Sequence, residues 1–420
     1  MNLVTACEST IDASNAADTE WDVVVIGAGP AGALTATLLA RRGLKTLLVE
    51  KRVFPRYKVC GACLNPLSLT LLASAGLAHV VADAVPLDRF CLQSSGGTLT
   101  LDLPGSVSLS REQLDARLAQ AAIDAGAMFL SGCSAKVLPL ENGRNWRVCP
   151  APQREVELTT GDRNRIVVET AVVVAADGLT HGSLSQLKEF NTQIVEASRL
   201  GAGTVVEKAP AFYEPGCIHM ASARAGYVGL VRLEDGRLNV AAALDSSAVE
   251  KSGSLAETAR RVIESAGFPP IESLREAEWT GTPSLTRETR PLASQRVFLV
   301  GDAAGYVEPF TGEGMAWALA SATSVVPLVQ CACERWDSIL ERTWNDDWQR
   351  NVGRHLGWCR RLAQLLRHPV AVSALTRLLA TCPWLAQPVL RRLNRIPQPD
   401  SQTRYNSETV QSETVQKAAG

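Results

Sequence analysis

The sequence predicts an α/β protein in which a parallel, nucleotide-binding sheet is interrupted by a mainly β region and followed by helices. Three observations predict this fold. An apolar run at 22–26 leads through a glycine-rich turn into an Ala- and Leu-rich stretch and a second apolar run, which is the βαβ pattern of a parallel sheet. A second strand followed by glycines occurs near residue 300, and the alternating apolar runs of residues 195–290 lie between the two patterns.

Composition places the chain among globular proteins. It has 420 residues, 46% of them hydrophobic and 20% charged, and its 9 Trp and mean hydropathy of +0.03 exclude a largely disordered chain. The length corresponds to roughly two or three domains. A net charge of −1 and a pI near 6.6 argue against nucleic acid as a partner, because phosphate binding needs a basic surface. With only 5 His and no ligand spacing, we expect no metal.

The N-terminus and the cysteines indicate a cytoplasmic protein. Residues 1–20 contain no Lys or Arg and no apolar core segment, unlike a secretory signal. The 11 Cys are scattered along a long chain, which is not the disulfide framework of a small secreted domain. No run of about 18 consecutive apolar residues occurs, so we expect no helix that spans a membrane.

The elements are expected in the following order. Strands at 22–26 and 45–50 flank a helix at 30–42, a helix with a Ser N-cap covers 110–125, and an antiparallel meander over 127–170 leads to a strand at 171–176. A strand at 296–300 and a helix at about 313–333 follow the β region, and the rest is helical to about 395. The predicted organisation is a disordered tail at 1–20, a discontinuous nucleotide-binding domain at 21–194 and 291–333, a substrate-binding β domain at 195–290, a helical region at 334–397 and a disordered tail at 398–420.

The glycine-rich turn Gly27–Gly32 predicts a dinucleotide site. Gly27 permits the tight turn, Gly29 lets the backbone approach a pyrophosphate, and Gly32 lets the helix pack closely on the strand. The phosphates would lie at the helix N-terminus, where free N–H groups favour negative charge. Glu50, at the end of the next strand, can accept hydrogen bonds from ribose hydroxyls and disfavours a 2′-phosphate. This motif by itself fits FAD or NAD.

The second glycine motif favours FAD. Gly301–Gly305 and the segment 309–314 (PFTGEG) resemble the second FAD fingerprint of glutathione-reductase-type flavoproteins. Asp302 can accept hydrogen bonds from hydroxyls of the cofactor, and a helix beginning near Gly312 would direct its N–H groups at the flavin edge that becomes negative on reduction. We therefore expect a Rossmann-like FAD-binding domain of the glutathione reductase type, with an inserted mainly β substrate domain and a helical C-terminus.

A family resemblance rests on two segments. The segment Phe54–Gly61 (FPRYKVCG) resembles the FPRxKxCG segment of the geranylgeranyl reductase family, which belongs to the FAD superfamily of the p-hydroxybenzoate hydroxylase type. Aromatic hydroxylases of that superfamily usually carry GDAAH, whereas GDAAG, ending here at Gly305 and followed by PxxGEG, is similar to the reductase branch. The resemblance covers about residues 21–395. It implies FAD binding, hydride or oxygen chemistry at the flavin, and often a lipophilic substrate.

The resemblance also implies individual contacts. Arg56 and Arg111 would bind cofactor oxygens through charge-assisted hydrogen bonds. Two segments depart from the family pattern: Asp177-Gly178 is not followed by the usual Ser and Arg, and the substrate segment has only a weak counterpart around Tyr227. The predicted cofactor contacts are Gly27, Gly29, Pro30, Ala31, Gly32, Glu50, Lys51, Arg56, Arg111, Asp177, Gly301, Asp302, Gly312 and Gly314.

The catalytic residues are not identified by the sequence, and Cys60 and Tyr227 are the two candidates. Cys60 and Cys63 form a CxxC pair, which allows a redox disulfide, a cysteine beside the flavin, or plain packing. The cysteine context of the superfamily's disulfide reductases is missing here, which argues against the redox pair.

The C-terminal region is strongly basic. No Asp or Glu occurs from Arg350 to Pro399, whereas nine Arg do, alternating with Leu, Val and Trp up to Arg395. A basic amphipathic helix can lie on an anionic membrane surface. The alternative is a helical cap over the substrate domain.

Three functions are open at this stage. The first is an FAD-dependent oxidoreductase similar to geranylgeranyl reductases, which moves a hydride through flavin N5 to or from an isoprenoid- or polyketide-like compound, with NAD(P)H as reductant. The second is an NAD(P)H-dependent flavin monooxygenase that hydroxylates its substrate. The third is an electron-passing flavoprotein that docks a partner or a membrane. The sequence does not indicate an oligomeric state.

Overall fold

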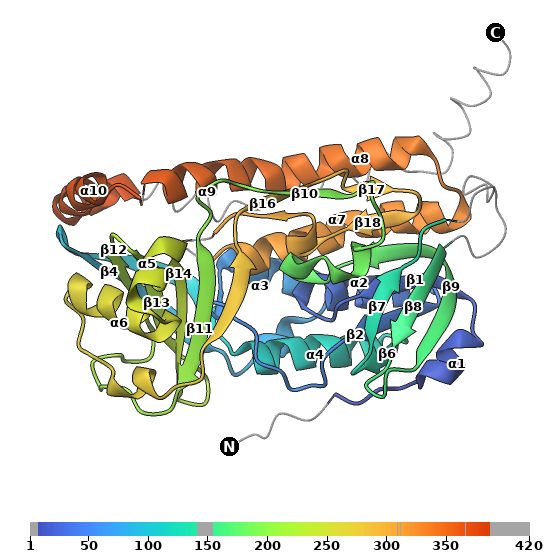
Figure 1. The fold of residues 1–420 in the computed structure, drawn as a ribbon, viewed down its shortest axis with the longest axis horizontal. Coiled ribbons are helices and arrows are strands. Elements are labelled where there is room, and N and C mark those ends of the chain that lie inside the picture. Colours follow the sequence, from blue (N-terminus) through green and yellow to red (C-terminus); the bar gives the residue numbers. More distant parts are fainter. Residues whose placement is uncertain (1–6, 141–153, 309, 311, 366, 387–420) are drawn as a thin grey trace, which may run out of the picture.

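Two large sheets lie side by side in the computed structural model, and a long helical arm runs along the edge of both (Figure 1). The structure describes residues 7–140, 154–308, 310, 312–365 and 367–386. The predicted tail at 398–420 lies outside these residues. The α/β fold and its nucleotide-binding sheet are as predicted.

The first sheet contains the two strands expected to flank the glycine turn. Its order is β17-β18-β9-β1-β2-β6, with β7 and β8 added beside β9. The central strands β1, β2, β9, β18 and β6 pair in parallel, so their carboxyl ends meet at one edge, where the glycine turns follow. The strands are β1 (Trp21–Ile26), β2 (Thr46–Glu50), β6 (Met128–Ser131), β7 (Ser134–Val137), β8 (Arg154–Thr159), β9 (Arg165–Ala175), β17 (Ala293–Ser294) and β18 (Val297–Leu299).

Three helices pack on this sheet and on each other: α2 (Pro30–Ala40), α4 (Arg111–Asp124) and α7 (Gly314–Glu334). The sheet and these helices share the largest apolar core. Among the described helices, α7 is long and apolar enough to cross a membrane by length and composition. This corrects our expectation, which required an uninterrupted apolar run, whereas α7 reaches a high mean hydropathy with scattered Ser, Thr and Gln. Because 67% of its apolar window is buried inside the protein, α7 is a core helix here.

The second sheet has the order β15-β11-β14-β13-β12-β4-β5-β3. We expected this mainly β region to come from residues 195–290, but three of its strands come from residues 63–108, and β4 pairs in parallel with β12. The region 195–290 also contains α5 (Ser246–Ser252) and α6 (Leu255–Ala266). The strands are β3 (Cys63–Leu64), β4 (Val85–Ser94), β5 (Gly97–Ser108), β11 (Leu200–Val206), β12 (Cys217–Ala223), β13 (Gly226–Arg232), β14 (Leu238–Leu244) and β15 (Thr280–Ser284).

The two faces of the second sheet carry separate apolar cores. The helix α6 covers one face, with Val262 and Ile263 against Val228 and Val240. The other face carries Phe90 and Tyr227 and meets Phe310, from the segment just before α7. A small antiparallel sheet is formed by β10 (Asn191–Ile194), β16 (Arg287–Arg290) and β19 (Gly305–Tyr306).

The C-terminal region is helical, as predicted, as far as it is described. The helix α8 (Ser338–Trp348) continues through a π-helical turn (Gln349–Gly353) into α9 (Arg354–Leu365), and α10 (Pro369–Thr381) follows. This arm passes over the first sheet and ends over β4 and β5 of the second (Figure 1). The short helix α3 (Pro66–Ser74) packs against α7.

The N-terminal tail expected at 1–20 is structured from Cys7 onward. The helix α1 (Ala13–Ala17) begins at Asp12, whose side chain accepts a hydrogen bond from Asn15 N. The backbone of Thr10 donates to Phe129 O on β6, and Ser131 N donates to Ser9 Oγ. The polar composition suggested disorder, but these residues form hydrogen bonds with the backbone of β6 at the edge of the sheet. The local sequence does not reveal this pairing.

Candidate functional site

The first glycine turn lies where β1, β9 and α2 converge. A Cβ added to Gly27 would lie 2.5 Å from Ala176 O, and one on Gly32 would lie 1.8 Å from Gly27 O. Gly27 also has φ +102°, which favours glycine. The backbone therefore has to pass through this point without side chains, which leaves the start of α2 open to a ligand.

The start of α2 is suited to an anion. Gly29 is its N-cap and offers no side-chain cap, and Pro30 is its first residue. The first N–H groups of a helix have no partner inside the helix and attract negative charge. The Glu50 carboxylate accepts from Ala28 N at 3.0 Å, so the acid predicted to bind ribose stands beside this turn.

Two arginines and a buried carboxylate flank the turn. Arg56 reaches Glu50 at 3.2 Å and Asp115 at 2.9 Å. Arg111 binds Asp115 with two nitrogens, at 2.8 and 2.7 Å. Burial alone would raise the pKa of Asp115, but Arg111 and Arg56 outweigh it and hold that pKa below its usual range. Asp115 thus stays ionised and fixes both guanidinium groups beside the N-terminus of α2.

A third cation, Lys58, lies at the same place. Its Nζ would be 3.2 Å from a Cβ on Gly178, and an Arg111 nitrogen would be 3.6 Å from one on Gly29. Burial lowers the pKa of Lys58, and Arg111 and Arg56 lower it further, while Asp302 partly offsets them. Lys58 therefore lies between the first glycine turn and the acid of the second motif.

The second glycine motif meets the first. A Cβ on Gly301 would lie 2.9 Å from the Cβ of Ala31 in α2, and Gly301 has φ +59°. Burial raises the pKa of Asp302, against the opposing charges of Lys58, Arg111 and Arg287. Gly312, with φ +84°, packs toward Cys63, and Gly314 is the first residue of α7. The starts of α2 and α7 thus bound one site.

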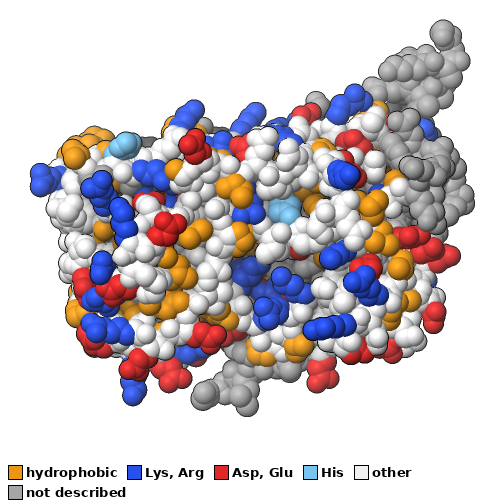
Figure 2. Space-filling view, in the orientation of Figure 1, with side chains coloured by type: hydrophobic (Ala, Val, Ile, Leu, Met, Phe, Trp, Pro, Cys, Tyr) orange, Lys and Arg blue, Asp and Glu red, His pale blue; other side chains and the backbone are white. Residues whose placement is uncertain are grey.

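The residues at this site fit FAD. The glycine turns leave a backbone cradle that side chains would fill, and the buried Nε of Arg56 and Oδ1 of Asp177 have no hydrogen-bond partner among the described residues. The space-filling view is hollowed near its centre, between the two large sheets, and Lys and Arg side chains gather around the hollow (Figure 2). A dinucleotide would supply the missing acceptors and donors and the negative charge.

The other predicted residues differ in their contacts. Lys51 is exposed and stands outside this cluster of contacts. Asp177 accepts from Ser183 N at 2.8 Å, so one of its oxygens holds the following turn. Cys60 and Cys63 are both free thiols; Cys63 Sγ donates to Gly61 O at 3.1 Å, and burial raises its pKa. Cys60 lies beside Arg111.

An apolar wall with a charged edge faces the start of α7. Tyr227 on β13 packs edge-on against Phe310 with ring centroids 5.1 Å apart, and Phe310 packs against Phe90 at 6.0 Å. The guanidinium of Arg199 lies 5.5 Å from the Tyr227 ring centre. Arg199 is 1% exposed and pairs with Glu308 at 3.4 Å, whose second oxygen has no partner in the described part of the chain.

That buried pair has electrostatic consequences. Burial raises the pKa of Glu308, while Arg199 and Arg367 partly offset the effect and Asp245 adds to it. Asp245 lies 3.1 Å from Arg199 and 3.6 Å from Arg367 of the C-terminal arm. The charged edge of the apolar wall therefore joins β11, β14 and the C-terminal arm.

Sequence reasoning missed several of these residues: Lys58, Asp115, Arg199, Arg287 and Glu308. Lys58 lies two residues after Arg56 in the segment FPRYKVCG, and Asp115 lies four residues after Arg111, so both spacings carried a usable signal. For Arg199, Arg287 and Glu308 the local sequence carries none, because their partners are distant in the chain.

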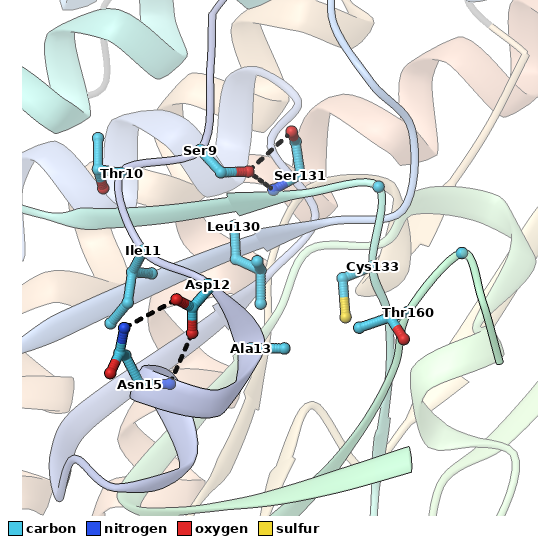
Figure 3. A pocket seen from close by; sticks show the side chains of 12 residues that line it. Ser9, Thr10, Ile11, Asp12, Ala13, Asn15, Leu130, Ser131, Cys133 and Thr160 are labelled. Atoms are coloured by element: carbon cyan, nitrogen blue, oxygen red, sulfur yellow. Dashed lines mark hydrogen bonds between the residues drawn. The ribbon is translucent and has the colours of Figure 1, made fainter. Parts of the chain in front are cut away.

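A separate surface pocket lies away from this site. It lies between the N-terminal segment with α1 and the end of β6, and has a volume of about 550 Å³ (Figure 3). Its lining includes Ser9, Asn15, Ser131, Cys133 and Thr160, and none of the predicted site residues. We therefore assign the function to the glycine turns and the apolar wall.

The fold and the two glycine turns are those expected of a flavoprotein, and the residues around the turns fit FAD. Residues 20–332 match the family model described as FAD binding domain, and the chain belongs to that family of FAD-dependent enzymes. The prediction of FAD as cofactor and of an FAD-dependent oxidoreductase or monooxygenase class is thus confirmed.

The similar proteins include reductases of isoprenoid compounds. The chain is 29% identical to menaquinone reductase of Mycobacterium tuberculosis over 379 residues, which are 84% of this chain and 85% of that protein. It is 28% identical to digeranylgeranylglycerophospholipid reductase of Thermoplasma acidophilum, covering 76% of this chain and 80% of that protein. The resemblance to the geranylgeranyl reductase family is confirmed.

Solved structures share the fold. A flavin-dependent brominase superposes with a TM-score of 0.71 at 15% identity, covering 96% of this chain and 99% of its own. The p-nitrophenol 4-monooxygenase of Pseudomonas putida superposes with a TM-score of 0.68 at 14% identity, covering 89% of this chain and 98% of its own. At these identities the likeness concerns the fold.

Proposed function

We propose that this protein reduces an isoprenoid or similarly lipophilic compound, with NAD(P)H as the electron donor. The observation that carries the proposal is the apolar wall of Tyr227, Phe310 and Phe90, which lies beside the segment leading into α7. A site bounded by aromatic and aliphatic side chains binds apolar substrates and excludes water. The names of the two relatives, both reductases of isoprenoid compounds, support the same substrate class.

The residues would divide the work as follows. Arg56, Lys58 and Arg111 neutralise the pyrophosphate at the start of α2, and Glu50 accepts from the ribose. FAD would supply hydride transfer at its N5. The N-terminus of α7 stabilises negative charge that develops near it. Tyr227 and Phe310 hold the substrate, and the Cys60 thiol interacts with Arg111 of the cofactor cluster.

The test is anaerobic reduction of the holoprotein, followed by flavin absorbance. We expect NADH or NADPH to bleach the flavin and a menaquinone or a geranylgeranylated lipid to restore the oxidised spectrum. The variant Phe310→Ala should slow reoxidation by the lipid by roughly tenfold, because it removes part of the apolar wall. The rate at which NADH or NADPH reduces the flavin of this variant should be unchanged.

Two other outcomes would contradict the proposal. Substrate-stimulated oxygen uptake that yields a hydroxylated product would make the protein a flavin monooxygenase. A flavin that stays oxidised with both nicotinamides, yet accepts electrons from a protein donor, would make it an electron carrier.

A further inference from the structure

The outer face of α9 is both basic and apolar. Arg354, Trp358, Arg361 and Leu365 are exposed and spaced at i, i+4, i+7 and i+11, so they form one stripe along the helix. The guanidinium of Arg361 lies 5.2 Å from the Trp358 ring centre. The opposite face, with Leu356, Cys359 and Ala363, is buried against the protein. The inner face is therefore packed against the protein, whereas the side chains of the outer stripe are exposed.

The outer face of α10 repeats this pattern. Val370 is 83% exposed, and Leu378 and Arg377 follow on the same side, two helical turns further on. Trp384, just beyond the helix, is 67% exposed. The inner residue Val372 packs into the apolar core that contains Tyr227 and Phe310.

Exposed large apolar side chains are concentrated on this arm. Five of them lie between residues 354 and 386 of the described chain: Trp358, Leu365, Val370, Leu378 and Trp384. In Figure 2, hydrophobic side chains gather at the upper left, over α10, near Lys and Arg side chains. Grouped exposure of this kind indicates an interaction surface, whereas single exposed apolar residues do not.

The charged side chains of α9 and α10 that form no ion pair with a described residue are all arginines. Arg350, Arg360 and Arg367 pair with acidic residues of the protein. Arg354, Arg361 and Arg377 form no ion pair with any residue that the structure describes. The sequence has no Asp or Glu from residue 348 to 399, so α9 and α10 contain no acidic residue of their own.

We propose that the outer stripes of α9 and α10, the docking face, bind the surface of a bilayer that contains anionic lipid. The docking face consists of Arg354, Trp358, Arg361, Leu365, Val370, Arg377, Leu378 and Trp384. Trp and aliphatic side chains enter the interface between headgroups and acyl chains, and Arg binds anionic headgroups. In a two-fold pair of copies of this chain the same arginines would face each other, which is unfavourable.

Docking would also bring a lipophilic substrate close to the apolar wall. This link between docking and catalysis rests on the proposed function. The helix α10 presents Val370 and Leu378 outward and Val372 inward, toward the apolar wall. The outer side of α10 would then lie on the bilayer, while its inner side contacts the apolar wall. A lipophilic substrate dissolved in the bilayer would therefore have only this helix between it and the apolar wall. The docking itself depends only on the exposed side chains.

The experiment is flotation of the full-length holoprotein with vesicles of phosphatidylcholine alone or with added phosphatidylglycerol. We expect binding to the anionic vesicles, and release at 1 M salt, where the Debye length is about 3 Å. The triple variant R354Q/R361Q/R377Q should lower the partition coefficient about 100-fold, since each basic residue contributes about 1 kcal/mol at an anionic surface. W358S/V370S/L378S should lower it by more than roughly tenfold.

Two controls match these variants. R165Q/R261Q/R275Q removes three exposed arginines elsewhere and the same charge, and should bind like the unaltered protein. Flavin content and reduction by NAD(P)H should be unchanged in every variant. The flotation result can therefore be interpreted even if the test of the proposed function fails. Equal flotation of R354Q/R361Q/R377Q and the unaltered protein would overturn the proposal. The proposal would also be overturned if the unaltered protein did not float with vesicles but formed a dimer in solution that R354Q/R361Q/R377Q dissociates.

Discussion

Asp115 fixes the positive groups of the FAD site. Its carboxylate is fully buried and holds Arg56 and Arg111. Asp115→Asn would leave the buried guanidinium of Arg111 without its counter-charge and Arg56 paired with Glu50 alone, and we expect the free energy of unfolding to fall by about 3–5 kcal/mol. Urea titration at pH 7 measures this. Asp124→Asn, at the exposed end of the same helix, is the matched control and should change stability little.

The same substitution has a defined pH dependence. Asp115 has a folded-state pKa below its ordinary value of 3.8, so its contribution is present above that value and is lost as the pH falls through the folded pKa. The stability difference between Asp115→Asn and the unaltered protein should stay constant from pH 8 to about 5 and narrow only below about 4. A difference that already narrows near pH 6 would show that Asp115 is not held ionised.

Gly305 is restricted by both its backbone and its neighbour. It has φ +143°, and an added Cβ would lie 3.5 Å from the Trp348 ring. Gly305→Ala should cost about 1–3 kcal/mol from backbone strain. Gly305→His adds a ring that collides with Trp348 and should cost more. Thermal unfolding of both variants, and of Gly305→His with Trp348→Ala, tests this; the double variant should regain stability relative to Gly305→His alone.

What could be predicted about the site depended on the distance between partners in the chain. Glu50 and Asp302 follow strands at fixed places in known motifs, and the structure places both beside glycine turns. Asp115 lies four residues after Arg111 within the helix expected at 110–125, but that position alone does not show that its side chain is buried between two arginines. Glu308 and Arg199 are 109 residues apart, so only the folded chain brings them together.

At the scale of elements, β12 carries a titratable group inside an apolar layer. Phe212, Tyr213 and Phe268 surround His219, with ring centroids 5.3, 5.3 and 5.8 Å away. Burial lowers the pKa of His219 from 6.5 to about 4, with Glu214 opposing and Arg89 adding to the shift. His219 is therefore neutral in the folded protein at pH 7.

The expected consequence is a loss of stability in mild acid. Between pH 6.5 and 4 the unfolded chain binds a proton that the folded chain does not, so stability falls as the pH falls. His219→Phe keeps an aromatic ring and should flatten this part of the Tm against pH curve. His79→Phe, on the short turn before β4, is the control and should leave the slope unchanged. An equal slope in His219→Phe would contradict the buried neutral state.

The elements themselves were predictable where the pattern was local. The βαβ unit and α7 lie within a few residues of the expected ranges, since apolar periodicity and glycine turns mark them. The strands β4 and β5 were not predicted; they fall within the range 21–194 expected for the nucleotide-binding domain but belong to the second sheet, because β4 pairs with β12 more than a hundred residues away. Strand order depends on which edges meet, and alternation along one strand does not specify its partner.

At the scale of the whole molecule, the proposed FAD site is assembled from segments far apart in the chain. Lys58, from the N-terminal half, lies near Asp302, and the starts of α2 and α7 bound the same site. Bound FAD therefore connects segments that are otherwise joined by packing, and its removal should lower the Tm. Restoring FAD to about 100 times its Kd should raise the free energy of unfolding by about 2.7 kcal/mol.

Lys58→Met separates this linkage from simple loss of structure. Without the cation between the glycine turns, we expect FAD to bind about 10–100-fold more weakly, because a charge-assisted hydrogen bond is worth about 1.5–3 kcal/mol. The Tm of the FAD-free protein should not fall, since burial disfavours the charged lysine there. Fluorescence titration with FAD and thermal unfolding of the FAD-free protein give the two readouts. Lys188→Met, an exposed lysine, should match the unaltered protein in both. Unchanged FAD affinity in Lys58→Met would mean that the phosphates lie away from the point where the two motifs meet.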